Sequence, residues 1–339
     1  MRHGCPHRRL APDVSPATCD DYLDSAMTCR ICENKENNRT FVAREMMFGF
    51  RDDFNYFECE KCGCVQIKDV PENLGKYYPT NYYSFQKAGA LKSFLRRQWA
   101  FYSYHGWGLI GLSMSVVLGK NQAVESVKRA NIPKDIAILD IGCGSGDLLL
   151  LLHSLGFTNL TGTDPFLAEN IAYKNGVKVW KKDISEISQK YDLIMSHHSF
   201  EHMRDPAKTL THVLRLLNPG GLLIVRVPIA GTYAWKTYGV NWVQLDPPRH
   251  IFLPTVRSME ALSTKVGLKL GQIIYESNEF QFWGSEQYSH DIPLRDPRSL
   301  APLSKQAMAH LKMRKYRARA AKLNAQGQGD SACFYFHKP

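Results

Sequence analysis

Three glycines follow an acidic residue at the end of an apolar segment, in the stretch LDIGCGSGDLLLLL (139–152). The acid is Asp140 and the glycines are Gly142, Gly144 and Gly146. Glycine after a buried strand lets the backbone turn sharply, or lets a ligand approach closer than a Cβ atom would allow. No Lys-Ser or Lys-Thr pair closes the run, so a loop that cradles ATP phosphates is not predicted. A carboxylate here would repel a pyrophosphate but attract a ligand with an ammonium and a sulfonium group, such as S-adenosylmethionine.

Further polar residues end the strand-like segments downstream. Asp164 lies about 20 residues past the glycines, where an acid can bind two ribose hydroxyls. Asp183 and Ile184 follow the third segment, where an adenine amino group and ring would lie, and Ser196 ends the fourth. Because ligands of open parallel sheets bind beyond the carboxyl ends of the strands, we expect all of these residues at one cofactor site.

Histidine and glutamate side chains are candidates for proton transfer. Methyl transfer needs alignment of two reactants, plus a base if the acceptor is a hydroxyl. His250, in the loop WVQLDPPRHIFLP, is the leading candidate because histidine titrates in the useful range. Glu201 and His202 follow the fourth segment, with a role in capping or in substrate contact. The spacing His198-x-x-Glu201-His202 also matches an inverted zinc-protease pattern, which would need a long helix and a third ligand that we do not predict here.

Two pairs of cysteines have the spacing of metal-binding turns. They are Cys29-x-x-Cys32 and Cys59-x-x-Cys62, with Cys64 as a spare thiol. Each pair would present two thiolates to one tetrahedral Zn²⁺. A closed site of four thiolates is structural, because it leaves the metal no open position for chemistry.

The candidate cofactor and proton-transfer residues lie in a part of the sequence where a strand, turn and helix pattern repeats from Ile136 onward. The pattern predicts an α/β fold, with a parallel sheet covered by helices on both faces. Expected strands are 136–141, 160–164, 177–180, 193–196, 222–227, 268–275 and 332–337, with a helix over 258–266. The apolar run Trp107–Leu118 is too short to cross a bilayer, and we expect it to pack inside the protein.

The pieces LDIGCGSG, TGTDPF, KKDISEI, YDLIMSHHSFEHMRDP and LLNPGGLLIVRVP occur in this order. In this the chain resembles class I S-adenosylmethionine-dependent methyltransferases, over roughly 132–337. The resemblance implies a Rossmann-like sheet of seven strands whose last strand is antiparallel. A similar zinc ribbon precedes this domain in a group of bacterial enzymes that modify sugars and other small molecules. The sugar C-methyltransferases of that group carry a further C-terminal domain that this chain is too short to contain, which argues against C-methylation.

We therefore predict four regions: a disordered lead-in (1–26), a zinc ribbon (27–70), a connector with a helical segment (71–130) and the methyltransferase domain (131–339). An insertion, about 277–330, precedes the last strand, and its basic segment 302–324 is expected to be helical. Met27 is a candidate for the natural start. The N-terminus lacks an apolar signal core, and no membrane span is predicted, so we expect a cytoplasmic protein without a membrane partner.

The predicted function is methyl transfer to a small molecule, with a hydroxyl of a sugar or related metabolite as acceptor, S-adenosylmethionine as cofactor and structural zinc. The net charge of +11 favours an anionic or nucleotide-linked substrate. An RNA methyltransferase is the main alternative, although the fourth segment lacks the Asn/Asp-Pro-Pro-Tyr-like motif of amino methylation. A non-catalytic S-adenosylmethionine-binding scaffold is a second alternative.

Overall fold

The computed structural model describes residues 27–78 and 89–339. The lead-in predicted over 1–26 lies outside these ranges. Within the described residues, no helix is both long and apolar enough to cross a membrane.

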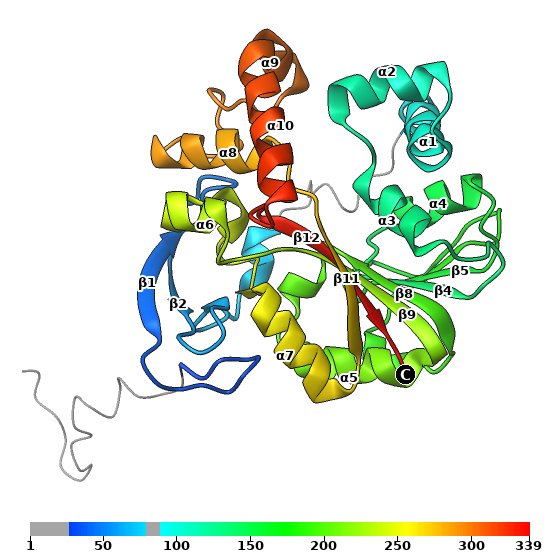
Figure 1. Cartoon of the computed structure of the whole chain (residues 1–339), viewed down its shortest axis with the longest axis horizontal. Coiled ribbons are helices and arrows are strands. Elements are labelled where there is room, and N and C mark those ends of the chain that lie inside the picture. The colour runs from blue at the N-terminus through cyan, green and yellow to red at the C-terminus, as the bar shows by residue number, and fades with distance from the viewer. Residues whose placement is uncertain (1–26, 79–88) are drawn as a thin grey trace, which may run out of the picture.

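The larger sheet runs in the order β11-β12-β9-β8-β4-β5-β7-β6 (Figure 1). Its strands are β4 (Ile138–Ile141), β5 (Leu160–Thr163), β6 (Ile171–Ala172), β7 (Lys178–Trp180), β8 (Tyr191–His197), β9 (Leu217–Pro228), β11 (Lys269–Tyr275) and β12 (Ser331–His337). Strands β4, β5, β7, β8 and β9 are parallel to their neighbours in this group, and β12 lies antiparallel between β9 and β11. Every strand expected from the sequence is present, with shifted ends.

The expected count of seven strands is wrong by one. The additional strand, β6, is two residues long and pairs antiparallel with β7 at the edge of the sheet. Two residues are too few to show the alternation that reveals a strand in a sequence, so pairing with β7 alone defines it.

The sheet separates two hydrophobic cores, because successive side chains of a strand point to opposite faces. In β12, Phe334 and Phe336 belong to the core that includes α5 and α7, whereas Cys333 and Tyr335 belong to the core that includes α3 and α4. The helices are α1 (Ala90–His105), α2 (Leu109–Leu118), α3 (Gln122–Ala130), α4 (Asp147–Ser154), α5 (Pro206–Leu216), α6 (Tyr233–Tyr238), α7 (Val256–Val266), α8 (Phe280–Ser289), α9 (Leu303–Met308) and α10 (His310–Ala325). The basic segment of the insertion is helical, as expected, and forms α9 and α10.

The apolar run Trp107–Leu118 does not pack inside the protein, contrary to the sequence expectation. It contains all of α2, whose single buried residue is Gly111. A Cβ atom on Gly111 would lie 2.3 Å from the Gln98 backbone oxygen of α1, so the two helices approach closely at this point. Figure 1 shows α1 and α2 projecting together from the body of the protein, which leaves the outer face of α2 in solvent.

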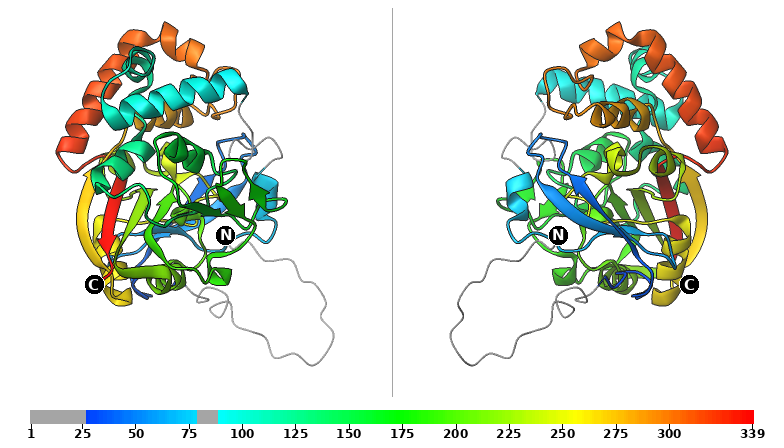
Figure 2. Two further views of the ribbon diagram at one scale, coloured as in Figure 1. Left: turned by 90° about the vertical axis from the view of Figure 1, so that its right-hand side faces the viewer. Right: turned by 90° about the vertical axis from the view of Figure 1, so that its left-hand side faces the viewer.

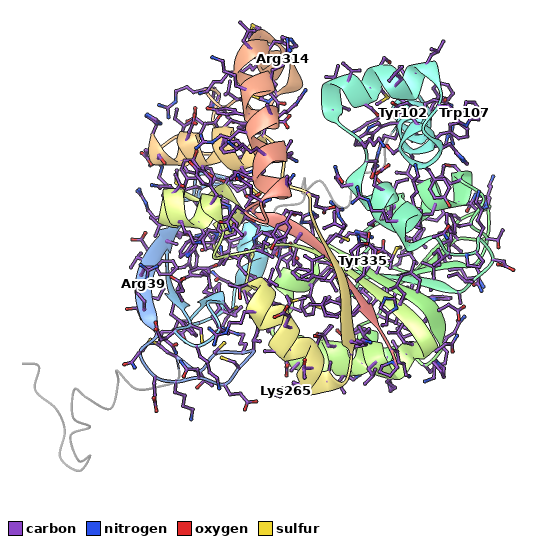
Figure 3. All side chains as sticks on the ribbon, in the orientation of Figure 1. Arg39, Tyr102, Trp107, Lys265, Arg314 and Tyr335 are labelled. Atoms are coloured by element: carbon purple, nitrogen blue, oxygen red, sulfur yellow. The ribbon has the colours of Figure 1, made fainter. Side chains whose placement is uncertain are left out.

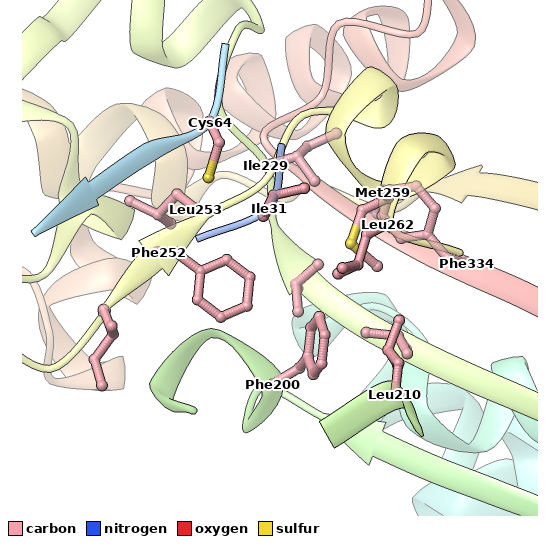
Figure 4. Close-up of a cluster of buried hydrophobic side chains, with 14 of the residues drawn as sticks. Ile31, Cys64, Phe200, Leu210, Ile229, Phe252, Leu253, Met259, Leu262 and Phe334 are labelled. Atoms are coloured by element: carbon pink, nitrogen blue, oxygen red, sulfur yellow. The ribbon is translucent and has the colours of Figure 1, made fainter. Parts of the chain in front are cut away.

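The N-terminal residues form a second, four-stranded sheet in the order β1-β2-β3-β10. Strands β1 (Arg39–Arg44), β2 (Asp53–Glu58) and β3 (Val65–Ile67) come from the cysteine region, whereas β10 (Phe252–Leu253) follows the loop that contains His250. Figure 4 shows Ile31 and Cys64 packed beside Phe252 and Leu253 in one buried cluster. The cysteine region and the larger sheet therefore share a core.

Candidate active site

The glycine bend after β4 has a backbone that disfavours other residues. Gly142, Gly144 and Gly146 have φ values of +67°, +54° and +85°. A Cβ atom on Gly142 would lie 2.5 Å from the Cβ atom of Ser199. The bend therefore needs glycine for its turn and for its contact with the segment after β8.

Two buried aspartates flank this bend. The Asp164 carboxylate accepts hydrogen bonds from the backbone N–H groups of Gly144 and Phe166, both at 2.9 Å. Burial raises the pKa of Asp164. Burial, together with the nearby charge of Asp164, raises the pKa of Asp140 to about 8. Two buried carboxyl groups that interact electrostatically in this way favour a cation as their neighbour.

The other predicted cofactor residues occupy the neighbouring strand ends. Asp183 caps the 3₁₀ helix η3 (Ile184–Glu186) by accepting the Ser185 N–H at 2.9 Å, and its carboxylate is exposed while Ile184 is buried. Ser196 is buried at the end of β8, and its hydroxyl lies 2.6 Å from the Ser199 hydroxyl. Sequence reasoning missed Ser199, which also donates to the Ile141 carbonyl at 2.7 Å and so ties β8 to the bend.

Glu201, His202 and His250 come together, as their candidate roles require. Their ligand-type atoms all lie within 4.8 Å of one another. His250 Nε2 is 3.9 Å from Glu201 Oε1, and the two imidazole centroids are 4.8 Å apart. Glu201 and His202 belong to the 3₁₀ helix η4 (Phe200–His202), which begins directly after Ser199. The cluster therefore adjoins the glycine bend.

Backbone carbonyls orient both histidines. His250 Nδ1 lies 2.7 Å from the Gln244 oxygen, and His202 Nδ1 lies 2.8 Å from the Arg249 oxygen. A protonated Nδ1 that donates to a carbonyl leaves Nε2 with a free lone pair. Lone pairs of this kind could accept a proton or, together with Glu201, hold a metal ion.

The charges in this cluster follow from its burial. Burial alone would raise the pKa of Glu201, but the surrounding histidines lower it to about 2. Burial and the neighbouring His202 lower the pKa of His250 to about 4. At neutral pH the cluster thus contains a carboxylate next to a neutral imidazole. Neither Glu201 oxygen has a hydrogen-bond partner among the described residues, so the buried charge is available to stabilise a cation that forms beside it.

The inverted zinc-protease pattern is not realised. His198 has a left-handed backbone, φ +51°, and η4 is only three residues long, so no long helix presents His198 and His202 together. The His198 Nδ1 atom instead lies 3.6 Å from Glu201 Oε1, next to the cluster.

The loop that presents His250 is held by residues of the N-terminal sheet. The Tyr56 hydroxyl, on β2, donates to the His250 carbonyl at 2.8 Å. The fully buried Arg249 guanidinium bonds to the Asp246 carboxylate at 2.6 Å and to the Glu45 carboxylate at 2.8 Å. These bonds raise the pKa of Arg249. Sequence reasoning missed Glu45 and Tyr56, because they precede the loop by about 200 residues and no motif links the two regions.

The four paired cysteines converge on one point. Cys29 Sγ lies 3.5 Å from Cys62 Sγ, Cys32 Sγ lies 3.5 Å from Cys59 Sγ, and all four sulfurs lie within 4.8 Å of one another. A tetrahedral ion with Zn–S bonds of about 2.3 Å places its sulfurs roughly 3.8 Å apart, so the group fits zinc. The buried Gln66 amide donates to Cys29 Sγ at 3.2 Å, as outer partners of metal ligands do.

Comparisons with known proteins agree with this geometry. The family described as "Methyltransferase domain" matches residues 120–273. The ubiquinone biosynthesis O-methyltransferase of Azorhizobium caulinodans is 29% identical over 156 residues, which are 41% of this chain and 61% of that protein. The match thus spans less than two thirds of that relative. The trans-aconitate 2-methyltransferase of Shigella dysenteriae is 26% identical over 186 residues, which are 51% of this chain and 68% of the relative.

Solved structures include the cyclopropane synthase MmaA2 of Mycobacterium tuberculosis, at 16% identity and a TM-score of 0.43, covering 73% of this chain and 94% of that one. The family that matches residues 120–273 and the two relatives named above are all methyltransferases, and the matched residues contain the glycine bend and the cluster of Glu201, His202 and His250.

Proposed function

We propose that the protein transfers the methyl group of S-adenosylmethionine to a hydroxyl of a small molecule, with a sugar or a related metabolite as acceptor. The observation that carries the proposal is the cluster of Glu201, His202 and His250 next to the glycine bend. The name ubiquinone biosynthesis O-methyltransferase supports O-methylation, and the name trans-aconitate 2-methyltransferase supports a small carboxylate as acceptor. The net charge of +11 is favourable for an anionic acceptor.

The bound cofactor supplies an electrophilic methyl group on a sulfonium. Asp140, the glycine bend, Asp164, Asp183 and Ile184 would hold it. His250 Nε2 would accept the proton that the acceptor hydroxyl loses on methylation. Glu201, whose buried carboxylate lies 3.9 Å from His250 Nε2, would stabilise the imidazolium that results.

Screening metabolite extracts with a methyl-labelled cofactor tests this function and identifies the acceptor from the labelled product. RNA labelling that weakens steeply as salt rises would instead support the RNA methyltransferase, because phosphate contacts release counterions. Binding of the cofactor with no labelled product in either pool would favour the scaffold.

Replacing Asp164 by alanine should weaken S-adenosylmethionine binding by about 1–3 kcal/mol, through loss of charged hydrogen bonds to the ribose. Calorimetry measures this change. Asp205→Ala is a matched control, because Asp205 likewise accepts a backbone N–H, from Lys208 at 2.9 Å, but at the start of α5. Equal affinities for the Asp164 variant and the unaltered protein would remove Asp164 from the site.

Cofactor binding should release a proton from Asp140. The pKa of about 8 leaves this acid mostly protonated at neutral pH, and a cationic ligand favours its ionised form. Affinity should therefore rise between about pH 6 and about pH 8 and then level off. Calorimetry in buffers of different ionisation enthalpy counts the released protons. The Asp140→Asn protein should release none, and the same proton release from that variant would assign the effect to another group.

We also propose that Cys29, Cys32, Cys59 and Cys62 hold one structural zinc ion. The distances between their sulfurs and the donor from Gln66 support this proposal. Cys64 lies outside the group of four and directs its thiol to the Val65 carbonyl.

A further inference from the structure

The helical hairpin of α1 and α2, residues 90–118, exposes an apolar surface that the proposed function does not use. Helix α2 contains no charged residue. Trp107, Leu109 and Val116 are 66%, 85% and 72% exposed. Further exposed large apolar side chains on the hairpin are Leu91, Phe94, Ile110, Leu112, Val117 and Leu118. Many exposed apolar side chains gathered on one pair of helices mark an interaction site more often than scattered single residues do.

Internal contacts hold the hairpin in this shape. The close approach at Gly111 fixes α2 on α1. The Trp99 indole donates to the Gly119 carbonyl at 2.7 Å, which ties the end of α2 to the middle of α1. The Phe101 and Trp107 rings meet edge to face, with centroids 4.6 Å apart, across the turn between the helices. The apolar surface is therefore part of a formed structure.

The charged residues near this surface favour an anionic binding partner. The sequence from Asn73 to Val124 contains no Asp or Glu, whereas Lys92 and Arg97 are exposed on α1. Lys120, which follows α2, is also exposed and lies 3.4 Å from the Glu125 carboxylate. Two copies facing each other would bring these cations together, which disfavours a dimer through this surface. An anionic surface with an apolar interior would bind both the cations and the apolar side chains.

A second basic projection lies at the same end of the molecule. Helices α9 and α10 project from the same end of the molecule as the hairpin in Figures 1 and 2. Met308 and Leu311, where the two helices meet, are 81% and 72% exposed. Arg314, labelled on α10 in Figure 3, and Lys315 are exposed and form no ion pair within the described ranges. Both projections thus combine apolar side chains with cations.

We propose that this end of the protein docks on a membrane surface that contains anionic lipids, with α2 lying in the interface. Helix α2 has ten residues and cannot span the hydrocarbon core, so it would lie along the surface with its apolar side chains among the acyl chains. The tryptophans at positions 99 and 107 suit the interfacial region, where one end of the ring is apolar and the other is wet. The proposal does not depend on the methyl transfer reaction.

Sedimentation of the full chain with vesicles tests the proposal. The protein should pellet with vesicles of phosphatidylcholine that contain phosphatidylglycerol, and much less with phosphatidylcholine alone, because the cations need anionic headgroups. Leu109→Glu combined with Val116→Glu should lower the fraction bound to anionic vesicles at least about tenfold. Both side chains are exposed, so the fold should tolerate the change. Val42→Glu is the matched control, since Val42 is an exposed apolar residue on β1, away from the hairpin in Figure 1.

Arg314→Glu combined with Lys315→Glu tests the second projection, and should weaken vesicle binding while leaving the circular dichroism spectrum unchanged. Unaltered vesicle binding by the Leu109 and Val116 double variant would overturn the proposal. So would a dimer, seen by light scattering without vesicles, that the same double variant dissociates, because a second copy would then cover the surface.

Discussion

His250→Ala is expected to lower turnover by roughly 100-fold or more, while the affinity for S-adenosylmethionine stays unchanged. The variant lacks the Nε2 atom that faces Glu201 at 3.9 Å and that accepts the hydroxyl proton in the proposed reaction. The residues proposed to bind the cofactor lie at the strand ends, and the proposed cofactor site does not include the His250 imidazole. Steady-state kinetics with the identified acceptor, together with calorimetry of cofactor binding, would separate the two effects.

A second histidine provides a matched control for this experiment. His290 is exposed, and its Nδ1 atom lies 2.7 Å from the Glu286 carbonyl, as the His250 Nδ1 atom lies from Gln244. His290→Ala should therefore leave turnover unchanged. If the His250 variant were as active as the His290 variant, His250 would not be the base. A second metal ion per chain, besides the zinc proposed at the four cysteines, that His250→Ala removes would assign the cluster to a metal ion instead of a proton.

Loss of zinc is expected to abolish both the stability of the N-terminal sheet and the catalytic activity. Cys32→Ser combined with Cys62→Ser removes one ligand from each pair. Structural zinc supplies much of the folding free energy of small modules, so the melting temperature should fall by about 10 °C or more. Turnover should fall as well, because the sheet holds the His250 loop through Tyr56 and Glu45. Metal analysis should find one zinc per chain in the unaltered protein and less in the variant.

Cys64→Ala separates the loss of zinc from the loss of any buried thiol. Cys64 is fully buried directly before β3 but lies outside the group of four sulfurs, so this variant should keep its zinc. A Cys32 and Cys62 double variant that retains a full complement of zinc would refute the four-thiolate site. A zinc-free variant that keeps full turnover would show that the N-terminal sheet does not position His250.

The dependence of His250 on the N-terminal sheet has a clear structural basis. The buried Arg249 next to it is paired with Asp246 in its own loop and with Glu45 from the cysteine region. Removing one partner of a buried ion pair leaves an uncompensated charge, which is costly in a dry environment. Strand β10 adds backbone pairing between Phe252 and Gln66 of β3. The cysteine region, which precedes this loop by about 200 residues in the sequence, thus holds the loop of the candidate active site.

Some of the fold and of the site could be predicted because the signals are local. Short apolar runs in a repeated strand, turn and helix pattern marked the strands, and the glycines at 142, 144 and 146 marked a turn in which all three have a positive φ. The spacing of Cys29-x-x-Cys32 and Cys59-x-x-Cys62 predicted one cluster, because each pair forms a compact turn. The expectation for Trp107–Leu118 failed because an apolar sequence does not specify whether a partner covers it.

The sequence by itself determined the parallel sheet, the glycine bend, the acids at the strand ends and the cysteine pairs, since each depends on neighbours only a few positions apart. Tertiary structure alone decided that Glu201 lies next to His250, that Tyr56 and Glu45 hold the loop of that histidine, and that α2 stays exposed. The physical reason is that burial and pairing between distant segments depend on how the two sheets pack together, which no local spacing encodes.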